Sequence, residues 1–95
     1  MTTKIYRIRR ALIQALFSYT GAQDLDTLLC SPCVLAEAPS ADLAATAWQD
    51  LIDAGILQPL PGYAGQVARL VPSFRAEMEN NSGAVPYRPV LYGPR

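Results

Sequence analysis

The feature that most constrains the fold is the stretch LIDAGILQPLPGYAGQVARLVP at residues 51–72. Its apolar helical start runs into Gly55, and a glycine in this position commonly ends a helix. Two short β-rich runs, residues 56–58 and 67–71, then flank a turn with the sequence PGYAG. The stretch therefore predicts a helix that ends at Gly55 and is followed directly by a two-stranded β-hairpin.

Size and charge favour a single small domain. The chain has 95 residues, of which 51% are hydrophobic, so one core can form. Eight basic and eight acidic residues cancel, which gives no long-range attraction to polyanions. No run of apolar residues is long enough to span a membrane, and the N-terminal residues do not follow the pattern of a secretory signal. We therefore expect a cytoplasmic protein with reduced thiols and no contact with a membrane.

The first predicted helix, residues 3–19, has apolar side chains on two sides. One stripe is its expected buried face. The second stripe is Tyr6, Ile13 and Phe17, which lies roughly 130° away around the helix. Three large side chains left in water would mark a protein interface, so we expect an isologous homodimer to cover them. The alternative cover is the C-terminal tail of the same chain, which we favour less because its Pro and Gly residues argue against a fixed path.

Two more helical segments precede the hairpin. Residues 24–38 predict two short turns or a broken helix, because Pro32 cannot continue a helix but suits the first turn of a new one. Residues 40–54 give the clearest helix, with Ser40 as the N-cap residue. Its predicted inward face consists of Ala44, Ala47, Trp48 and Leu51.

The composition changes near residue 80. Residues 74–79 predict one more short helix, and the following NNSGAVPYRPVLYGPR has three Pro, two Gly and no helical pattern. We therefore predict a domain at residues 1–79 and an extended or flexible tail at residues 80–95. The fold class expected from all these elements is α+β, mainly α with a small β-hairpin.

The order of these elements resembles a winged helix-turn-helix domain over residues 3–79. The segments ADLAATAWQDLIDAGILQPL, PGYAGQVARLVP and SFRAEMEN look like the third helix, the wing and the C-terminal helix of that family. The family has three helices, a two-stranded wing and often a short helix after it, and the resemblance implies DNA binding through the third helix and the wing. The residues available for DNA contacts would be Lys4, Arg7, Arg9, Arg10, Gln49, Arg69 and Arg75.

The charges of the predicted third helix and wing argue against DNA. Neutralised phosphates supply most non-specific affinity, yet residues 40–54 and 62–66 contain no Lys or Arg. Asp42 and Asp53 are instead expected on the solvent face of this helix. We therefore predict a module that acts through protein–protein contacts, as a homo-oligomer or a partner subunit. A DNA-binding transcriptional regulator is the alternative.

The motif CSPC, from Cys30 to Cys33, does not have the surroundings of a functional site. A redox motif needs a preceding strand in a βαβ unit, and none is predicted. A structural zinc site needs four ligands, whereas the chain has two Cys and no His. We expect two reduced, partly buried cysteines. The sequence also lacks a nucleophile elbow and a phosphate-binding loop, so no enzyme activity, metal, cofactor or small-molecule ligand is predicted.

Overall fold

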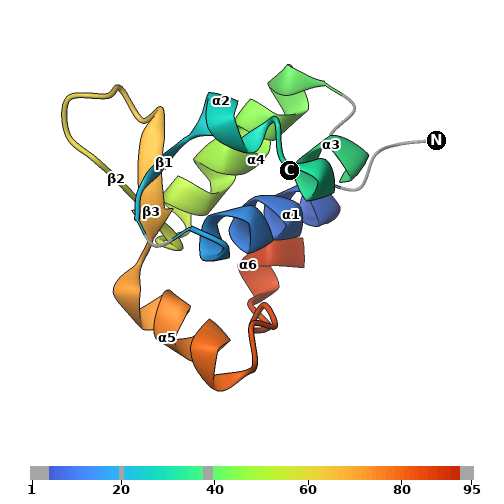
Figure 1. Cartoon of the computed structure of the whole chain (residues 1–95), viewed down its shortest axis with the longest axis vertical. Helices are drawn as coiled ribbons and strands as arrows, with labels where there is room; N and C mark the ends of the chain where they lie inside the picture. Colours follow the sequence, from blue (N-terminus) through green and yellow to red (C-terminus); the bar gives the residue numbers. More distant parts are fainter. Residues whose placement is uncertain (1–4, 20, 38–39, 93–95) are drawn as a thin grey trace.

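The computed structural model describes residues 5–19, 21–37 and 40–92 and has an α+β fold, with helices packed beside a small antiparallel sheet (Figure 1). The predicted class is confirmed at this level. In chain order the elements are α1 Ile5–Phe17, β1 Gln23–Asp24, α2 Leu25–Leu28, α3 Pro32–Glu37, α4 Ala41–Asp53, β2 Leu57–Pro59, β3 Val67–Leu70, α5 Pro72–Asn80 and α6 Pro89–Tyr92.

The core lies where α1 packs against α4 and α3. The predicted inward face of α4 is confirmed, because Ala44, Ala47, Trp48 and Leu51 are all buried. The N-cap is also as predicted, since the Ser40 side chain accepts a hydrogen bond from the Leu43 amide at 3.2 Å. Gly55 follows the end of α4 with a φ of 77°, a conformation that only glycine adopts without strain.

The predicted break in the second helical segment is confirmed. The Asp24 side chain caps α2 by accepting a hydrogen bond from the Asp26 amide at 2.8 Å. Pro32 is the first residue of α3, where its missing N–H removes no helical hydrogen bond. The Ser31 carbonyl accepts a bond from the Leu35 amide at 2.9 Å. Two short helices therefore replace one continuous helix.

The sheet has a third strand that the sequence analysis did not predict. The predicted hairpin forms as β2 and β3, with Gln58 opposite Arg69, and β1 pairs with the other side of β3. The strand order is β1-β3-β2. Because β1 has only two residues, both polar, it carries no alternation of apolar and polar residues. Its pairing with β3, about forty positions away, creates the strand.

The tail differs from the extended or flexible segment that its Pro and Gly residues predict. It returns to α1 and ends in the single turn α6, which lies beside α1 (Figure 1). Leu91 of α6 is completely buried, and the Gln14 side chain on α1 donates a hydrogen bond to the Gly83 carbonyl at 3.2 Å. Leu91 therefore completes the core and Val85 packs against it, whereas Tyr87 remains exposed.

Candidate protein-contact surface

The apolar stripe predicted on α1 is covered by its own chain. Ile13 is completely buried in the same core cluster as Leu91 of the tail. Phe17 is half-buried and would be 3.4 Å from a Cβ atom placed on Gly83, and Tyr6 is half-buried too. This corrects the expected exposure of Ile13. A homodimer stays a prediction, but Ile13 is not available to hold it together.

The basic cluster predicted on α1 does not form one surface. Arg9 is only 4% exposed, and its Nε and Nη2 atoms donate to Asp50 Oδ2 on α4 at 3.2 and 2.8 Å. Its Nη1 atom donates to the Leu91 carbonyl at 3.0 Å. Arg7 and Arg10 are exposed, and Lys4 lies outside the described residues. This corrects the assignment of Arg9 to a DNA-contacting surface.

The hydrogen bonds of Arg9 stabilise the packing of the helices. A buried charge is costly unless it is paired and hydrogen-bonded, and the guanidinium of Arg9 meets both requirements in one place. It joins α1 to Asp50 of α4 and to Leu91 of α6. The tail is therefore held by a polar contact as well as by apolar packing.

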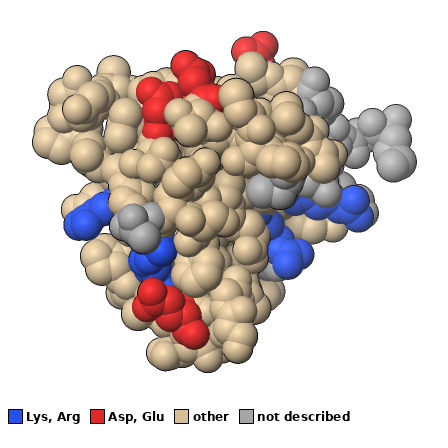
Figure 2. Space-filling model, viewed as in Figure 1, with Lys and Arg blue, Asp and Glu red and all other residues tan. Residues whose placement is uncertain are grey.

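The outward face of α4 is acidic, as predicted. Asp42, Gln49 and Asp53 are exposed, with Ala45 beside them. The Gln49 side-chain amide donates to Asp53 Oδ1 at 2.9 Å, so the residue that could read a base is engaged within the helix. Figure 2 shows acidic side chains on the upper edge of the molecule and basic ones lower down, of which those at the lower left lie beside acidic side chains. This face of α4 therefore offers carboxylates and no cation.

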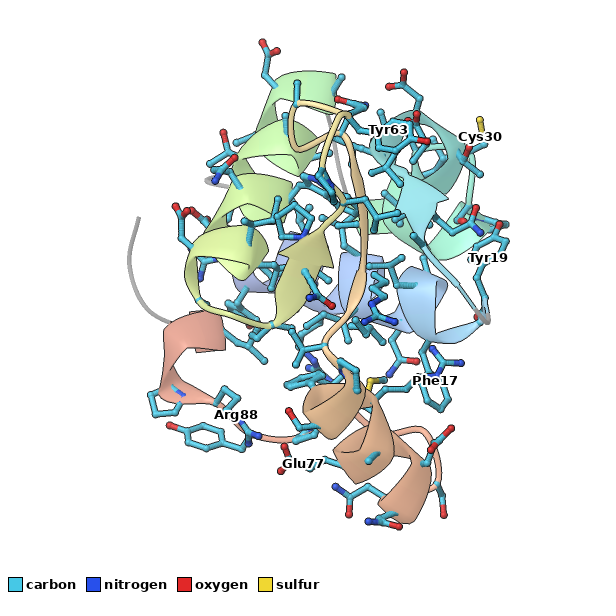
Figure 3. The ribbon with its side chains drawn as sticks, turned by 90° about the vertical axis from the view of Figure 1, so that its left-hand side faces the viewer. Phe17, Tyr19, Cys30, Tyr63, Glu77 and Arg88 are labelled. Carbon is cyan, nitrogen blue, oxygen red and sulfur yellow. The ribbon has the colours of Figure 1, made fainter. Side chains whose placement is uncertain are left out.

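The loop between β2 and β3 is fixed against α4. The indole Nε1 of Trp48 donates to the Gly65 carbonyl at 2.7 Å, which anchors the loop to the helix. Tyr63 in the same loop is 54% exposed, and Figure 3 shows it at the far end of the molecule from Glu77 and Arg88. The hairpin loop, residues 60–66, contains no charged residue.

Two hollows lie on either side of residues 59–61, which we name the hairpin ridge. Its sequence is Pro59-Leu60-Pro61. The helix hollow, of about 480 Å³, lies between the ridge and α4 and is lined by Gln49 and Ile52. The sheet hollow, of about 540 Å³, lies on the other side of the ridge and is lined by Gly21, Leu70 and Pro72 among others. The hairpin ridge is uncharged and has a hollow on each side, so a protein partner could contact it from both sides.

Arg69 and Arg75 both line the sheet hollow. Arg69 on β3 donates through Nε to Gln58 Oε1 at 2.9 Å. Arg75 on α5 donates through Nη2 to the Phe17 carbonyl at 3.2 Å and lies 5.0 Å from the centre of the Phe17 ring. Both arginines were predicted only as possible DNA contacts, and the structure brings them to one hollow. The hollow itself was missed, because its walls come from three separate segments.

The cysteines do not form a site in the described structure. Cys30 is exposed and free, with its Sγ 3.7 Å from the Asp26 carbonyl, so its expected burial is wrong. The side chain of Cys33 lies outside the described part. Among the described residues, no three His, Cys, Asp or Glu side chains are grouped so that they could bind a metal ion.

None of the helices in residues 5–19, 21–37 and 40–92 has both the length and the apolar character that crossing a bilayer requires.

Searches of protein-family models, curated proteins and solved structures found no match to this chain. The hairpin ridge, its two hollows and the outward face of α4 are therefore interpreted from their own geometry and charge.

Proposed function

We propose that the chain is a non-enzymatic winged-helix module that acts through protein–protein contacts, as a homo-oligomer or a partner subunit. The order of its elements supports the fold assignment: α4 is followed directly by the hairpin β2–β3 and then by α5. In a winged helix, α4 would be the third helix and the hairpin would be the wing. The contact surface would then consist of the outward face of α4, the hairpin ridge and the two hollows.

The observation that carries this proposal is the charge of α4 and the hairpin loop, the parts of that surface that correspond to the third helix and the wing. Residues 40–68, which include all of α4, β2 and the hairpin loop, contain no Lys or Arg. Asp42 and Asp53 are exposed on the same helix. A DNA-binding protein needs cations where it approaches phosphates, and two carboxylates on the approaching helix would repel them. A protein partner has no such requirement.

The apolar character of the hairpin supports a protein partner directly. Pro59, Pro61 and Tyr63 are exposed, and Leu60 is half-buried beside them. Aromatic side chains are enriched in protein interfaces, and charged residues are depleted at their centres. The hairpin ridge and Tyr63 fit that composition, with the polar face of α4 as a rim.

DNA titration tests the choice between the two functions. Fluorescence anisotropy would follow a labelled random-sequence duplex at about 50 and about 150 mM salt. We expect a dissociation constant weaker than about 10 μM at the higher salt. Sub-micromolar binding with a steep salt dependence would overturn the proposal. Arg7→Ala and Arg10→Ala would then be the first variants to examine, since both side chains are exposed.

Sedimentation velocity tests the homo-oligomer. We expect the full chain to self-associate with rising concentration and Tyr63→Asp to weaken that association. Leu35→Asp is the matched control, because Leu35 is 62% exposed on α3 and thus comparable in exposure to Tyr63. A chain that stays monomeric at every concentration would rule out the homo-oligomer and leave a different protein as the partner. Equal effects of the two substitutions would argue against the hairpin as the contact surface.

A further inference from the structure

We propose that the sheet hollow binds an acidic peptide segment of a partner protein, with one apolar side chain inserted into the hollow and a carboxylate bound by Arg69 and Arg75. This inference rests on the proposed function, because it gives the chemistry of the partner that the contact surface recognises. It adds a specific site, a ligand class and two residues that select the ligand.

The walls of the hollow suit an apolar side chain. Pro59, Leu60 and Pro61 of the hairpin ridge form one side, and Leu70 and Pro72 contribute from β3 and the start of α5. The volume of about 540 Å³ lies in the usual range of ligand sites, roughly 300–1,000 Å³. Such sites are mainly apolar and contain a few well-placed polar groups.

The polar groups of this hollow are cationic. Arg69 and Arg75 line it, and none of the described residues that line it has a carboxylate. Glu79 lies near Arg75, with its Oε2 atom 3.9 Å from Arg75 Nε, but it is 61% exposed. An exposed pair of this kind contributes little to stability, and Arg69 forms no ion pair among the described residues, so the hollow keeps an excess of positive charge. In a chain with a net charge of zero, this local excess of positive charge selects an acidic ligand.

Both guanidinium groups already contact other residues of the chain before any ligand binds. The Arg69 side chain is fixed by Gln58 across the strand pair, and Arg75 by the carbonyl and ring of Phe17. A guanidinium has five N–H donors, and each of these bonds uses only one. The remaining donors can bind a carboxylate in the forked geometry that arginine favours. Because Arg75 is held by two contacts with Phe17, it loses less conformational entropy on binding than a free side chain would.

The ligand is a peptide side chain and carboxylate, not an added strand or a nucleic-acid backbone. Pro59 of the outer strand β2 has no N–H to pair with an incoming strand. The walls of the hollow are apolar, and the neighbouring helix hollow adjoins α4, which carries Asp42 and Asp53. Repulsion by those carboxylates disfavours a polyanion, whereas a short acidic segment reaches Arg69 and Arg75 without passing over α4.

NMR titration of the full chain with three short peptides tests the site. The ligand is acetyl-Leu-Glu-Glu-amide, and the matched peptides replace both Glu with Gln or the Leu with Ser. We expect saturable shifts of the amides of Gly21, Arg69 and Arg75 with the first peptide. Each matched peptide should bind about tenfold more weakly, because it lacks either the charge or the anchor. No saturable shift around the hollow up to about 20 mM peptide, or equal binding of the Gln peptide, would overturn the inference.

Charge-removing variants assign the binding to the two arginines. Arg69→Gln should lower the affinity for acetyl-Leu-Glu-Glu-amide about tenfold, and Arg75→Gln should do the same. Arg69 is exposed, so its variant is expected to fold even if loss of the Phe17 contact disturbs Arg75→Gln. Arg10→Gln removes an exposed charge from α1 and should leave the affinity unchanged. Equal losses in Arg69→Gln and Arg10→Gln would show a general charge effect and contradict the site.

The outcome is separable from that of the proposed function. Tight DNA binding with intact peptide binding at the hollow would refute the proposed function and leave the peptide site standing. Weak DNA binding with no peptide binding would refute the peptide site alone. A duplex that shifts the amides of Arg69 and Arg75 more strongly than the peptide would show that the ligand is a nucleic acid.

Discussion

The apolar stripe on α1 and the hairpin ridge are both rich in apolar residues, but the chain treats them differently. The α1 stripe is covered from within, with Ile13 completely buried and Leu91 of the tail in the same cluster. The hairpin ridge has no such cover among the described residues, and Tyr63 beside it is 54% exposed. Under the proposed function, the uncovered hairpin ridge is the surface that a protein partner would cover. Because the tail packs on α1, the α1 stripe is covered within the chain, and the hairpin ridge is not covered by any described residue.

The arginines show the same contrast. Arg9 is buried against Asp50 and fixes the covered side of the molecule. Arg69 and Arg75 lie on the open side, where they line the sheet hollow. The guanidinium of Arg9 stabilises the fold, whereas those of Arg69 and Arg75 still have N–H donors that can bind a ligand.

The largest expected effect comes from a charge placed on the covered stripe. Ile13→Glu would bury an unpaired carboxylate and should lower the free energy of unfolding by at least about 4 kcal/mol. Tyr63→Glu, on the open side, should change it by no more than about 0.5–1 kcal/mol. Urea unfolding followed by circular dichroism would measure both. The contrast between the two surfaces breaks down if Ile13→Glu is a stable monomer.

The next effect concerns the polar contact beneath the tail. Arg9→Met should cost about 3–5 kcal/mol, because the Asp50 carboxylate loses its charged partner in a mostly buried position. Arg10→Met is the control and should stay within about 0.5 kcal/mol, since Arg10 is exposed. Thermal and urea unfolding would compare them. Similar losses in the two variants would show that Arg9 has no special structural purpose.

A smaller effect is expected where α4 leads into the open side. Gly55→Ala should cost about 1–2 kcal/mol, because φ at this position is 77° and a side chain strains there. A Cβ atom at Gly55 or Gly21 would meet nothing within 4 Å, and Gly21 is not among the glycines with positive φ. Gly21→Ala is therefore the matched control, with almost no expected loss. Equal losses in unfolding experiments would attribute the cost to something other than backbone strain.

The parts of the fold that the sequence predicted rest on local signals. The Ser40 cap and the four inward residues of α4 are contained in one helix, and the hairpin follows directly from the turn after Gly55. Neighbouring residues are sufficient to define each of these features. The acidic outward face of α4 was predictable for the same reason.

The parts that were not predicted depend on distant partners. The strand β1 exists because it pairs with β3, and the pairing of Arg9 with Asp50 joins positions 41 apart. The tail was only the less favoured of two predicted covers for α1, because its Pro and Gly residues do not reveal the place that α1 offers to Leu91. The sheet hollow likewise combines residues from before β1, from the hairpin and from α5.

Sedimentation velocity of the chain with residues 81–95 deleted, run beside the full chain, tests the central claim most directly. The claim is that the tail covers α1 and leaves the hairpin side as the contact surface. It predicts that the deletion exposes the α1 stripe, so that the truncated chain associates more strongly than the full chain at the same concentration while circular dichroism still shows its helices. Identical sedimentation of the two chains, with unchanged unfolding, would contradict the claim.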